Sequence, residues 1–377
     1  MKMKYLKFLA AMLLFAGMTA CSDEPETPGS GDEDVKDPDK TEDVAGFYVL
    51  NEGAMGQNNA TIDYFGYDKS SYQLNIYPER NPSVVMELGD TGNDIAVYKD
   101  RLYAVINGSH KVEVMQAASA ERIGQVDISS PRSIVFDGNS AYVSSFVGGD
   151  DNHGSVVRFD LTTLKTTGSV SVGYCPEEMV IADGYLYVAN SQNYGIGAFD
   201  DKISVIKLDD FTVQPQSIKV GCNLRRLRAD GAGNLWVVSQ GNYADIAAKL
   251  YKLPKKGVND YGTPVEFDLA CNNIAVAGKK LYYYTTTYYA SWNATYTYGS
   301  LNTETGAEEG AFVDETVSKE LQTPYCLAVQ PENGDIFITD AKNYVSSGAL
   351  YCLDKDGALK WKVTTGVLPG HIAFLAK

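Results

Sequence analysis

Histidine is scarce in this chain, and the residue patterns that mark most enzyme families are missing. The 377 residues include only three histidines, His110, His153 and His371, which lie far apart in the sequence. The sequence contains no G-x-S-x-G nucleophile elbow, H-E-x-x-H zinc motif, P-loop or Rossmann fingerprint. It therefore presents no familiar set of catalytic or metal-ligating residues. We expect a protein that is not an enzyme, uses no cofactor and has no metal site.

Long hydrophobic runs and long amphipathic helices are also missing. After residue 20, no apolar run approaches the ~18 residues that a membrane-spanning helix requires. The residues after position 45 instead form short β-branched and aromatic runs, separated by Gly, Asn and Asp. This pattern is typical of an all-β protein.

The first twenty residues have the pattern of a secretory signal. Three lysines before position 8 precede the apolar run FLAAMLLFAGM, and the small residues Thr19 and Ala20 precede Cys21. The ending Met-Thr-Ala-Cys resembles a bacterial lipobox, although the consensus prefers Leu where Met18 stands. The resemblance implies cleavage before Cys21 and a diacylglycerol on its sulfur. The alternative is plain secretion, with Cys21 lost or unmodified.

Residues 21–45 have the composition of an acidic, disordered tether. Ten acidic residues and two lysines lie between Ser22 and Val44, with Pro and Gly and almost no apolar residues. Such a segment cannot bury enough surface to fold. An acidic cluster after a lipid-bearing cysteine resembles the surface-export signal of Bacteroidetes lipoproteins, which implies the cell surface of the outer membrane. A spacer facing the periplasm is the alternative.

The overall charge argues against one class of partner. The chain has a net charge of −16 at pH 7. A protein this acidic is repelled by the phosphates of nucleic acids, so we expect no nucleic-acid partner. Five cysteines follow Cys21 without zinc-type spacing, and we expect small buried packing residues rather than a defined set of disulfides. They are Cys175, Cys222, Cys271, Cys326 and Cys352.

An internal repeat organises the rest of the chain. Each unit reads as a strand, a Gly/Asp/Asn turn, a second strand, a variable loop and two further strands. Equivalent apolar residues of the first strands recur at spacings of 39 to 53 residues, which fits the ~40–50 residues of a four-stranded propeller blade. The six units begin at Asn93, Arg132, Glu177, Arg225, Asn272 and Tyr325.

A seventh unit is split between the two ends of the chain. GHIAFL, which begins at Gly370, matches the first strand of a blade, and FYVLNEG, ATIDYFGYD and YQLNIY near the start supply the other three. Pairing these ends closes the ring and protects the sheet edges. The sequence therefore predicts one domain over residues 46–377. It is a seven-bladed β-propeller of four-stranded blades, closed by a C-terminal strand that joins the N-terminal blade.

Several of these segments resemble the YncE-like propeller lipoproteins of Bacteroidetes. The resemblance rests on NEG at Asn51, NNATIDYF, DGYLYVANSQN and the terminal PGHIAF, and it covers roughly residues 46–377. This group includes vitamin-B12-capturing surface lipoproteins of the BtuG type. The resemblance implies cobalamin as the ligand and a TonB-dependent outer-membrane transporter of the BtuB type as the partner.

The loops between the second and third strands are the expected ligand-binding elements. In a propeller they lie on one face, with rigid strands behind them. They are rich in Tyr, Asn, Gln and Gly, which suits a large and mostly uncharged ligand. The alternative is that Tyr is merely frequent, with 26 in the chain. The candidate residues are Tyr194, Phe199, Asn242, Tyr243, Tyr288, Tyr289, Trp292, Tyr296, Asn343 and Tyr344.

Charged residues open the predicted innermost strands and face the same mouth. Arg132 and Arg225, together with Glu177, form either a polar ligand-binding set or an internal ion network that fills the channel. Because adjacent side chains alternate along a strand, Glu177 and Glu178 are not expected to face the same way. This removes the simplest paired-carboxylate catalytic site.

Three classes of function follow from these observations. The first is a binding protein that captures a large nutrient, cobalamin by the resemblance, and delivers it to the transporter. The second is a surface propeller that binds a glycan or a protein, for which aromatic platforms are equally suitable. The third is an enzyme of the lactonase or quinone-dependent dehydrogenase type, which the shortage of histidine disfavours.

Overall fold

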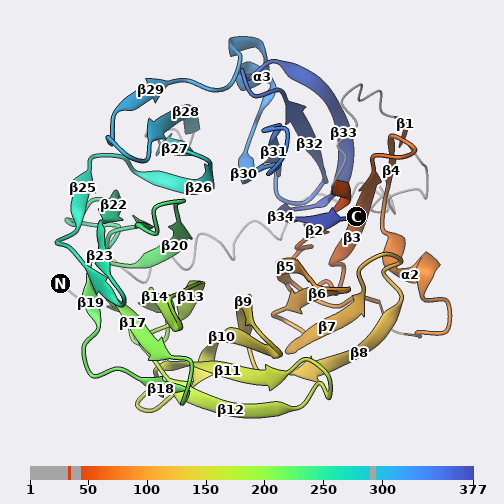
Figure 1. Cartoon of the computed structure of the whole chain (residues 1–377). Helices are drawn as coiled ribbons and strands as arrows, with labels where there is room; N and C mark the ends of the chain where they lie inside the picture. The colour runs from red at the N-terminus through yellow and green to blue at the C-terminus, as the bar shows by residue number, and fades with distance from the viewer. Residues whose placement is uncertain (1–32, 35–43, 86, 289–293) are drawn as a thin grey trace, which may run out of the picture.

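Seven antiparallel sheets stand around a central axis, as the repeat predicted. The computed structural model describes residues 33–34, 44–85, 87–288 and 294–377, and in these residues each sheet forms one blade of a β-propeller (Figure 1). The only helices in this part of the chain are two short ones, α2 (Ile76–Arg80) and α3 (Glu315–Glu320), both in connections between blades. Neither is long and apolar enough to cross a membrane.

Six blades are continuous in sequence. The first contains β5 (Gly92–Tyr98), β6 (Arg101–Ile106), β7 (Lys111–Gln116) and β8 (Arg122–Asp127). The second contains β9 (Pro131–Asp137), β10 (Ser140–Gly148), β11 (Gly154–Asp160) and β12 (Thr166–Ser171). The third contains β13 (Pro176–Ala182), β14 (Tyr185–Asn190), β17 (Lys202–Lys207), β18 (Thr212–Val213) and β19 (Ile218–Lys219).

The remaining continuous blades follow the same plan. The fourth contains β20 (Leu224–Ala229), β21 (Leu235–Ser239), β22 (Lys249–Leu253) and β25 (Val265–Phe267). The fifth contains β26 (Cys271–Ala277), β27 (Lys280–Tyr288), β28 (Ala294–Asn302) and β29 (Glu308–Gly310). The sixth contains β30 (Pro324–Val329), β31 (Ile336–Asp340), β32 (Ser347–Leu353) and β33 (Leu359–Val367).

The seventh blade joins the two ends of the chain. Its strands, from the axis outward, are β34 (Pro369–Ala376), β2 (Val44–Asn51), β3 (Thr61–Gly66), β4 (Ser71–Gln73) and β1 (Glu33–Asp34). β34 pairs antiparallel with β2, with Phe374 opposite Phe47 and Ile372 opposite Val49. Two small hairpins lie outside the blades: β15 (Gln192–Asn193) with β16 (Ala198–Phe199), and β23 (Lys255–Gly257) with β24 (Asp260–Tyr261).

The innermost strands form a closed ring around the axis. Each packs on the innermost strand of the next blade, in the order β34, β5, β9, β13, β20, β26, β30 and back to β34. The apolar side chains pack between neighbouring blades. One such cluster joins Phe47 and Phe65 of the seventh blade to Phe337 and Trp361 of the sixth. Closure of the ring therefore buries the last blade-to-blade interface.

The cysteines are free, and most are packing residues. Cys175, Cys271, Cys326 and Cys352 are buried, Cys222 is partly exposed, and none of these five forms a disulfide. The expectation of small packing residues is confirmed for the four buried ones.

The tyrosine-rich stretch of the fifth blade differs from the expected strand and loop. Tyr282 and Tyr284 pack in one cluster and Tyr283 in the next, because side chains alternate along a strand. However, the ladder continues far beyond Tyr284, through Thr286 opposite Tyr296 to the last residue of β27. Tyr296 therefore lies in a strand rather than in a loop. Alternating Thr and Tyr residues have high β propensity, which extends the hairpin.

Truncating Val49 tests whether the closing blade belongs to the core. Val49 is fully buried in β2 beside the closure ladder, whereas Val258 is 70 % exposed between β23 and β24. We expect Val49→Ala to lower the free energy of unfolding by about 2 kcal/mol, through lost transfer energy and a cavity. The matched Val258→Ala change is expected to cost less than about 0.5 kcal/mol. Equal small losses in urea unfolding would contradict tight ring closure.

Candidate functional site

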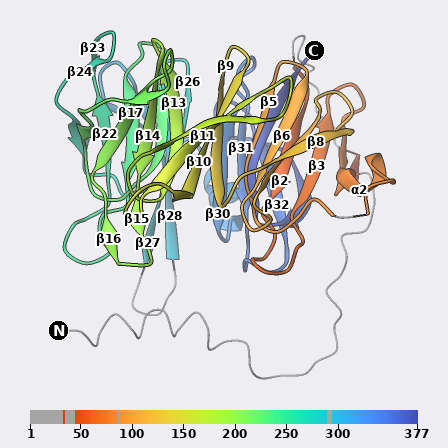
Figure 2. The same cartoon turned by 90° about the horizontal axis from the view of Figure 1, so that it is seen from below.

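The loops between the second and third strands gather at one end of the propeller. Figure 2 shows the β15–β16 hairpin and the extended ends of β27 and β28 at this end, with β23 and β24 at the other. We call this end the loop face. All seven innermost strands begin there, because each runs from the loop face toward the opposite face before the chain turns back. The loop face therefore combines variable loops with a ring of strand openings.

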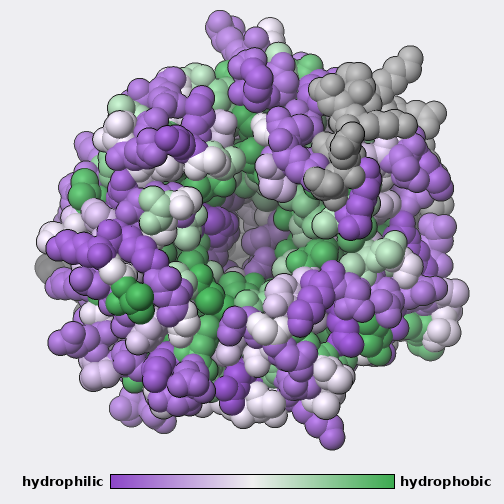
Figure 3. Space-filling view, viewed as in Figure 1, coloured by the Kyte–Doolittle hydropathy of each residue, from purple (hydrophilic) through white to green (hydrophobic). Residues whose placement is uncertain are grey.

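A cavity of about 400 Å³ opens along the axis at the loop face. Six of the seven predicted mouth residues line it: Asn93, Arg132, Glu177, Arg225, Asn272 and Tyr325. A second cavity of about 330 Å³ lies deeper and shares Asp94, Glu178, Arg226 and His371 with the first. Figure 3 looks down the axis from the opposite face, where the molecule is also hollowed at its centre and hydrophobic residues surround the opening.

Each innermost strand contains one extra residue where it opens. The register shifts by one residue between Leu224 and Arg226, and an equivalent shift occurs in the other six innermost strands. Such a bulge interrupts the alternation of side chains and re-aims them. Consecutive residues therefore both reach the cavity. The expectation that Glu177 and Glu178 face different ways is wrong for this reason, since both line it.

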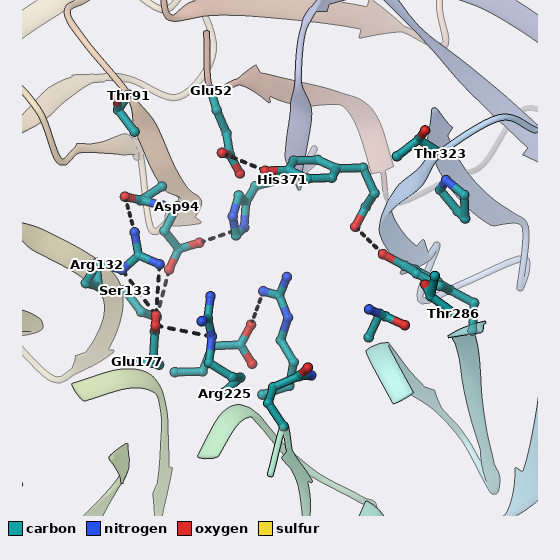
Figure 4. Close-up of a pocket in the computed structure, with 18 of the residues that line it drawn as sticks. Glu52, Thr91, Asp94, Arg132, Ser133, Glu177, Arg225, Thr286, Thr323 and His371 are labelled. Carbon is teal, nitrogen blue, oxygen red and sulfur yellow. Dashed lines mark hydrogen bonds and ion pairs between the residues drawn. The ribbon is translucent and has the colours of Figure 1, made fainter. Parts of the chain in front are cut away.

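The outer layer of the cavity is an ion network. Glu177 Oε2 accepts hydrogen bonds from Arg132 Nη2 at 2.9 Å and Nε at 3.1 Å, and Arg225 Nε lies 3.2 Å from Oε1 (Figure 4). Arg132 also donates to Asn93, and Arg225 Nη1 donates to the Tyr194 hydroxyl at 3.1 Å. The two arginines therefore form an ion network with Glu177, which is one of the two arrangements expected for these residues. Arg225 also connects the network to the rim.

The inner layer is a second set of charged groups. Arg226 Nη1 donates to Glu178 Oε1 at 2.8 Å, and Arg228 pairs with the other oxygen. Burial opposes ionisation of Glu178, but the two arginines outweigh it and hold its pKa at about 2. Asp94 accepts from Ser133 at 2.9 Å, and His371 Nδ1 lies 3.6 Å from its other oxygen. Burial and the nearby arginines lower the pKa of His371 to about 3, so it is neutral.

Two carboxyl groups in the cavity hold protons more tightly than usual. Burial raises the pKa of Glu52 to about 7, although Tyr325 donates a hydrogen bond to it at 2.9 Å. Burial likewise raises the pKa of Asp94 to about 6. Glu52 fills the position that a seventh mouth side chain would occupy, because a Cβ on Gly370 would lie 2.4 Å from Glu52 Oε1. Glycine in the closing strand therefore admits Glu52 to the ring.

An apolar rim surrounds this polar cavity. The described residues include fourteen exposed large hydrophobic side chains, and eight of them lie at the loop face: seven between the second and third strands of four blades, and Val147 near the end of β10. These eight are Met55, Val147, Tyr194, Ile196, Tyr243, Ile246, Tyr344 and Val345. Exposed apolar side chains gathered on one face mark an interaction surface. The aliphatic members were not among the predicted residues.

Three rim tyrosines follow an asparagine that folds the loop. The Oδ1 atoms of Asn193, Asn242 and Asn343 each accept hydrogen bonds from backbone N–H groups two or three residues further on. These Asx turns fix the loops. Tyr243 and Tyr344 have φ of 58° and 68°, a left-handed conformation that is rare for an aromatic residue. Asn242 and Asn343 therefore position the tyrosines.

The other predicted residues that the structure describes lie at the same end. Tyr194, Tyr243 and Tyr344 are 57 %, 65 % and 49 % exposed. Phe199 is half-buried in β16, with its ring 6.3 Å from that of Tyr243. Tyr296 lines the cavity from β28. Tyr288 is the last residue of β27, and its side chain is not described. Tyr289, Trp292 and Cys21 lie outside the described residues.

Sequence reasoning missed Glu52, Asp94 and Arg226. Asp94 and Arg226 each follow a predicted mouth residue, and they reach the cavity only because of the strand bulges. The one feature of the sequence that could have indicated Asp94 and Arg226 is that each directly follows the first residue of a repeat unit. In the described ranges, no group of three or more His, Cys, Asp or Glu side chains is arranged to hold a metal ion.

The fold and the axial cavity define the protein as a seven-bladed β-propeller. Residues 45–355 match a family described as a domain of unknown function, DUF5074, and the chain belongs to this family. A search of curated proteins found no match.

Solved structures share the fold at low identity. Hydrazine synthase of Kuenenia stuttgartiensis is 16 % identical with a TM-score of 0.59, covering 75 % of this chain and 89 % of that one. A quinoprotein alcohol dehydrogenase-like protein of Bacteroides thetaiotaomicron is 14 % identical with a TM-score of 0.57, covering 88 % and 79 %. Apo AztD of Citrobacter koseri is 11 % identical with a TM-score of 0.51, covering 89 % and 98 %.

Paired alanine and glycine variants test the strained rim backbone. Glycine adopts a left-handed conformation without the steric cost of a Cβ. We therefore expect Tyr243→Gly and Tyr344→Gly to be more stable than the corresponding alanine variants by about 1 kcal/mol. Tyr194 has no positive φ, so its glycine variant should be the less stable of the pair. Urea unfolding of the six variants measures this. If the glycine variant were the more stable, or the less stable, of the pair at all three sites, the left-handed conformation of Tyr243 and Tyr344 would be contradicted.

Removing the charge of Glu52 tests the buried carboxyl group. Its pKa of about 7 in the folded state exceeds the ordinary 4.5. The resulting stabilisation is present below about pH 4.5 and is lost as the pH rises through 7. We expect wild type to lose up to roughly 3 kcal/mol more than Glu52→Gln between pH 5 and pH 8. Gln keeps an acceptor for Tyr325.

The matched control is Glu332→Gln, at an exposed position in the turn between β30 and β31 that lines neither cavity. Its unfolding free energy should follow that of wild type at both pH values. Parallel pH profiles for wild type and Glu52→Gln would show that Glu52 is not buried as a protonated group.

Proposed function

We propose that this protein is a lipid-anchored binding protein of the outer-membrane surface that captures a large nutrient, cobalamin, at the loop face. In this proposal it passes the ligand to a TonB-dependent transporter of the BtuB type. The observation that carries the proposal is the apolar rim around a polar axial cavity. Rigid aromatic side chains give broad contact at low entropic cost, and the cavity beneath supplies hydrogen-bonding groups.

The size of the cavity favours a ligand that lies mainly on the rim. A volume of about 400 Å³ admits only part of a molecule as large as cobalamin. The flat corrin ring would lie against Tyr194, Tyr243 and Tyr344, while an amide arm enters the cavity. The resemblance to YncE-like lipoproteins supports this ligand, and the lipobox-like ending at Cys21 with its acidic tether supports the location.

Binding without catalysis is part of the proposal. The charged groups of the cavity are paired with one another, as in Arg132–Glu177 and Arg226–Glu178. His371 is buried and neutral, which makes it a poor proton acceptor at physiological pH. These features support a fixed polar surface rather than a proton-transfer site of a lactonase or a quinone-dependent dehydrogenase.

A protein partner is the second candidate for the rim. Met55, Ile196, Ile246 and Val345 are aliphatic and exposed beside the tyrosines. The buried core of a protein interface is more apolar than the rest of a protein surface, and Met is enriched there beside aromatic residues. This observation favours a protein over a glycan as the alternative ligand.

Calorimetric titration of residues 22–377 with cobalamin tests the proposal. We expect tight binding at one site, and we expect Tyr243→Ala and Tyr344→Ala each to weaken it at least ten-fold, since central aromatic residues carry most of an interface's energy. Val258→Ala is the control, because this exposed residue lies near β23 and β24, at the opposite face. Absence of heat with both cobalamin and cobinamide would reject the vitamin and favour a protein ligand.

A further inference from the structure

Two consecutive arginines of β20 point into the same cavity. Arg225 is the extra residue of the bulge at the start of this strand and Arg226 follows it, and both line the axial cavity. Their side chains are 31 % and 26 % exposed, so neither is sealed in the protein. Without the bulge, one of the two would face away from the other. The strand opening therefore brings two guanidinium groups to one place.

Each guanidinium group keeps N–H donors that are not used. A guanidinium has five N–H donors. Among the described residues, Arg225 contacts only Glu177 through Nε and Tyr194 through Nη1. Arg226 donates to Glu178 through Nη1 alone. By contrast, Arg132 uses Nε, Nη1 and Nη2 on Glu177 and Asn93. Free donors are thus concentrated on the β20 pair.

The charge balance of the cavity permits an anion beside these donors. The ionisable groups that line it are Glu52, Asp94, Arg132, Glu177, Glu178, Arg225, Arg226 and His371, together with the tyrosines Tyr284, Tyr296, Tyr325 and Tyr344. Near neutral pH, Asp94 with its pKa of about 6 is mainly ionised, Glu52 with its pKa of about 7 is only partly ionised, and His371 is neutral. Arg228 pairs with Glu178 from the deeper cavity, so four arginines face three ionised carboxylates and a partly ionised Glu52.

We propose that Arg225 and Arg226 form an oxyanion subsite, which holds a carboxylate or phosphate-ester group of the ligand while the ligand's apolar body lies on the tyrosine rim. The subsite rests on the proposed function only in placing the ligand at the loop face. Guanidinium groups bind such groups through paired N–H donors, with both charge and geometry contributing. Tyr194 lies next to the subsite, because its hydroxyl accepts from Arg225.

The subsite also explains the layered arrangement of the acids. Glu177 holds Arg225 from one side, and Glu178 holds Arg226 from the other, so each arginine is oriented without all of its donors being consumed. An anion that enters from the rim meets these oriented donors without moving the ion pairs. Preorganised groups of this kind bind with a smaller loss of side-chain entropy.

Small aromatic anions test the subsite directly. The probes are benzoate and phenyl phosphate, with benzyl alcohol as the neutral probe, measured by calorimetry and ligand-observed NMR on residues 22–377. We expect both anions to bind more tightly than benzyl alcohol. Arg225→Gln should weaken anion binding at least ten-fold and leave benzyl alcohol unchanged. Glu177→Gln should strengthen it several-fold, since a competing charge is removed. The stronger probe identifies the ligand group as a carboxylate or a phosphate ester.

The control is Arg122→Gln. Arg122 is also 31 % exposed and is also paired with a buried glutamate, Glu113, but it lies on β8, away from the cavity. We expect this variant to bind both anions like wild type. Arg226→Gln provides a second test, because Glu178 retains Arg228 as a partner and the fold is kept.

Two results would overturn the subsite. One is anion binding no tighter than that of benzyl alcohol, and the other is an equal loss in Arg225→Gln and Arg122→Gln. Neither outcome involves cobalamin. Arg225-dependent benzoate binding without cobalamin binding would retain the subsite and reject the vitamin, whereas the reverse would retain the vitamin and reject the subsite.

Discussion

The structure depends on the antiparallel pairing of β34 with β2. This ladder joins residues from the two ends of the described chain, and it buries the interface between the seventh blade and its neighbours. Without it the innermost strands form an open arc, and the cavity has no fixed diameter. The same pairing brings Gly370 beneath Glu52, so the closing ladder also completes the ring of side chains at the mouth. The ring of side chains at the mouth is therefore complete only when β34 is paired with β2.

The bulges at the strand openings convert a packed axis into a polar cavity. A regular innermost strand would send every second side chain into the space between blades, where the apolar clusters lie. One extra residue in each strand lets two consecutive side chains reach the axis. Glu177 with Arg225, and Glu178 with Arg226, then form two layers, and the opposite charges within each layer partly neutralise one another. Burying these charges in pairs keeps their desolvation cost moderate.

The fold was predictable because each blade, including the split seventh one, has a recognisable local pattern of short apolar strands separated by Gly, Asp and Asn turns. The rim tyrosines were also accessible, because loop residues such as Tyr194 and Tyr243 occupy equivalent places in the repeat. The cavity was not, because a bulge is a shift in pairing between strands and leaves no mark in one strand's sequence. The length of the β27–β28 hairpin was missed because Tyr296, taken as a loop residue, pairs with Thr286 across it. Glu52 was missed because its role depends on a glycine far away in the chain.

The rim and the cavity satisfy different physical demands. The cavity groups are cross-linked by ion pairs from several blades, so they cannot adapt to a ligand without breaking buried contacts. The rim residues stand on short Asx turns, and two of them hold a left-handed backbone that costs stability. The strained backbone of Tyr243 and Tyr344 directs both side chains outward. Glycine at these positions would relieve the strain but remove the aromatic side chain. The axial cavity is rigid and polar, and the rim above it is aromatic. This combination is suited to binding one end of a ligand by charge and the remainder by contact area.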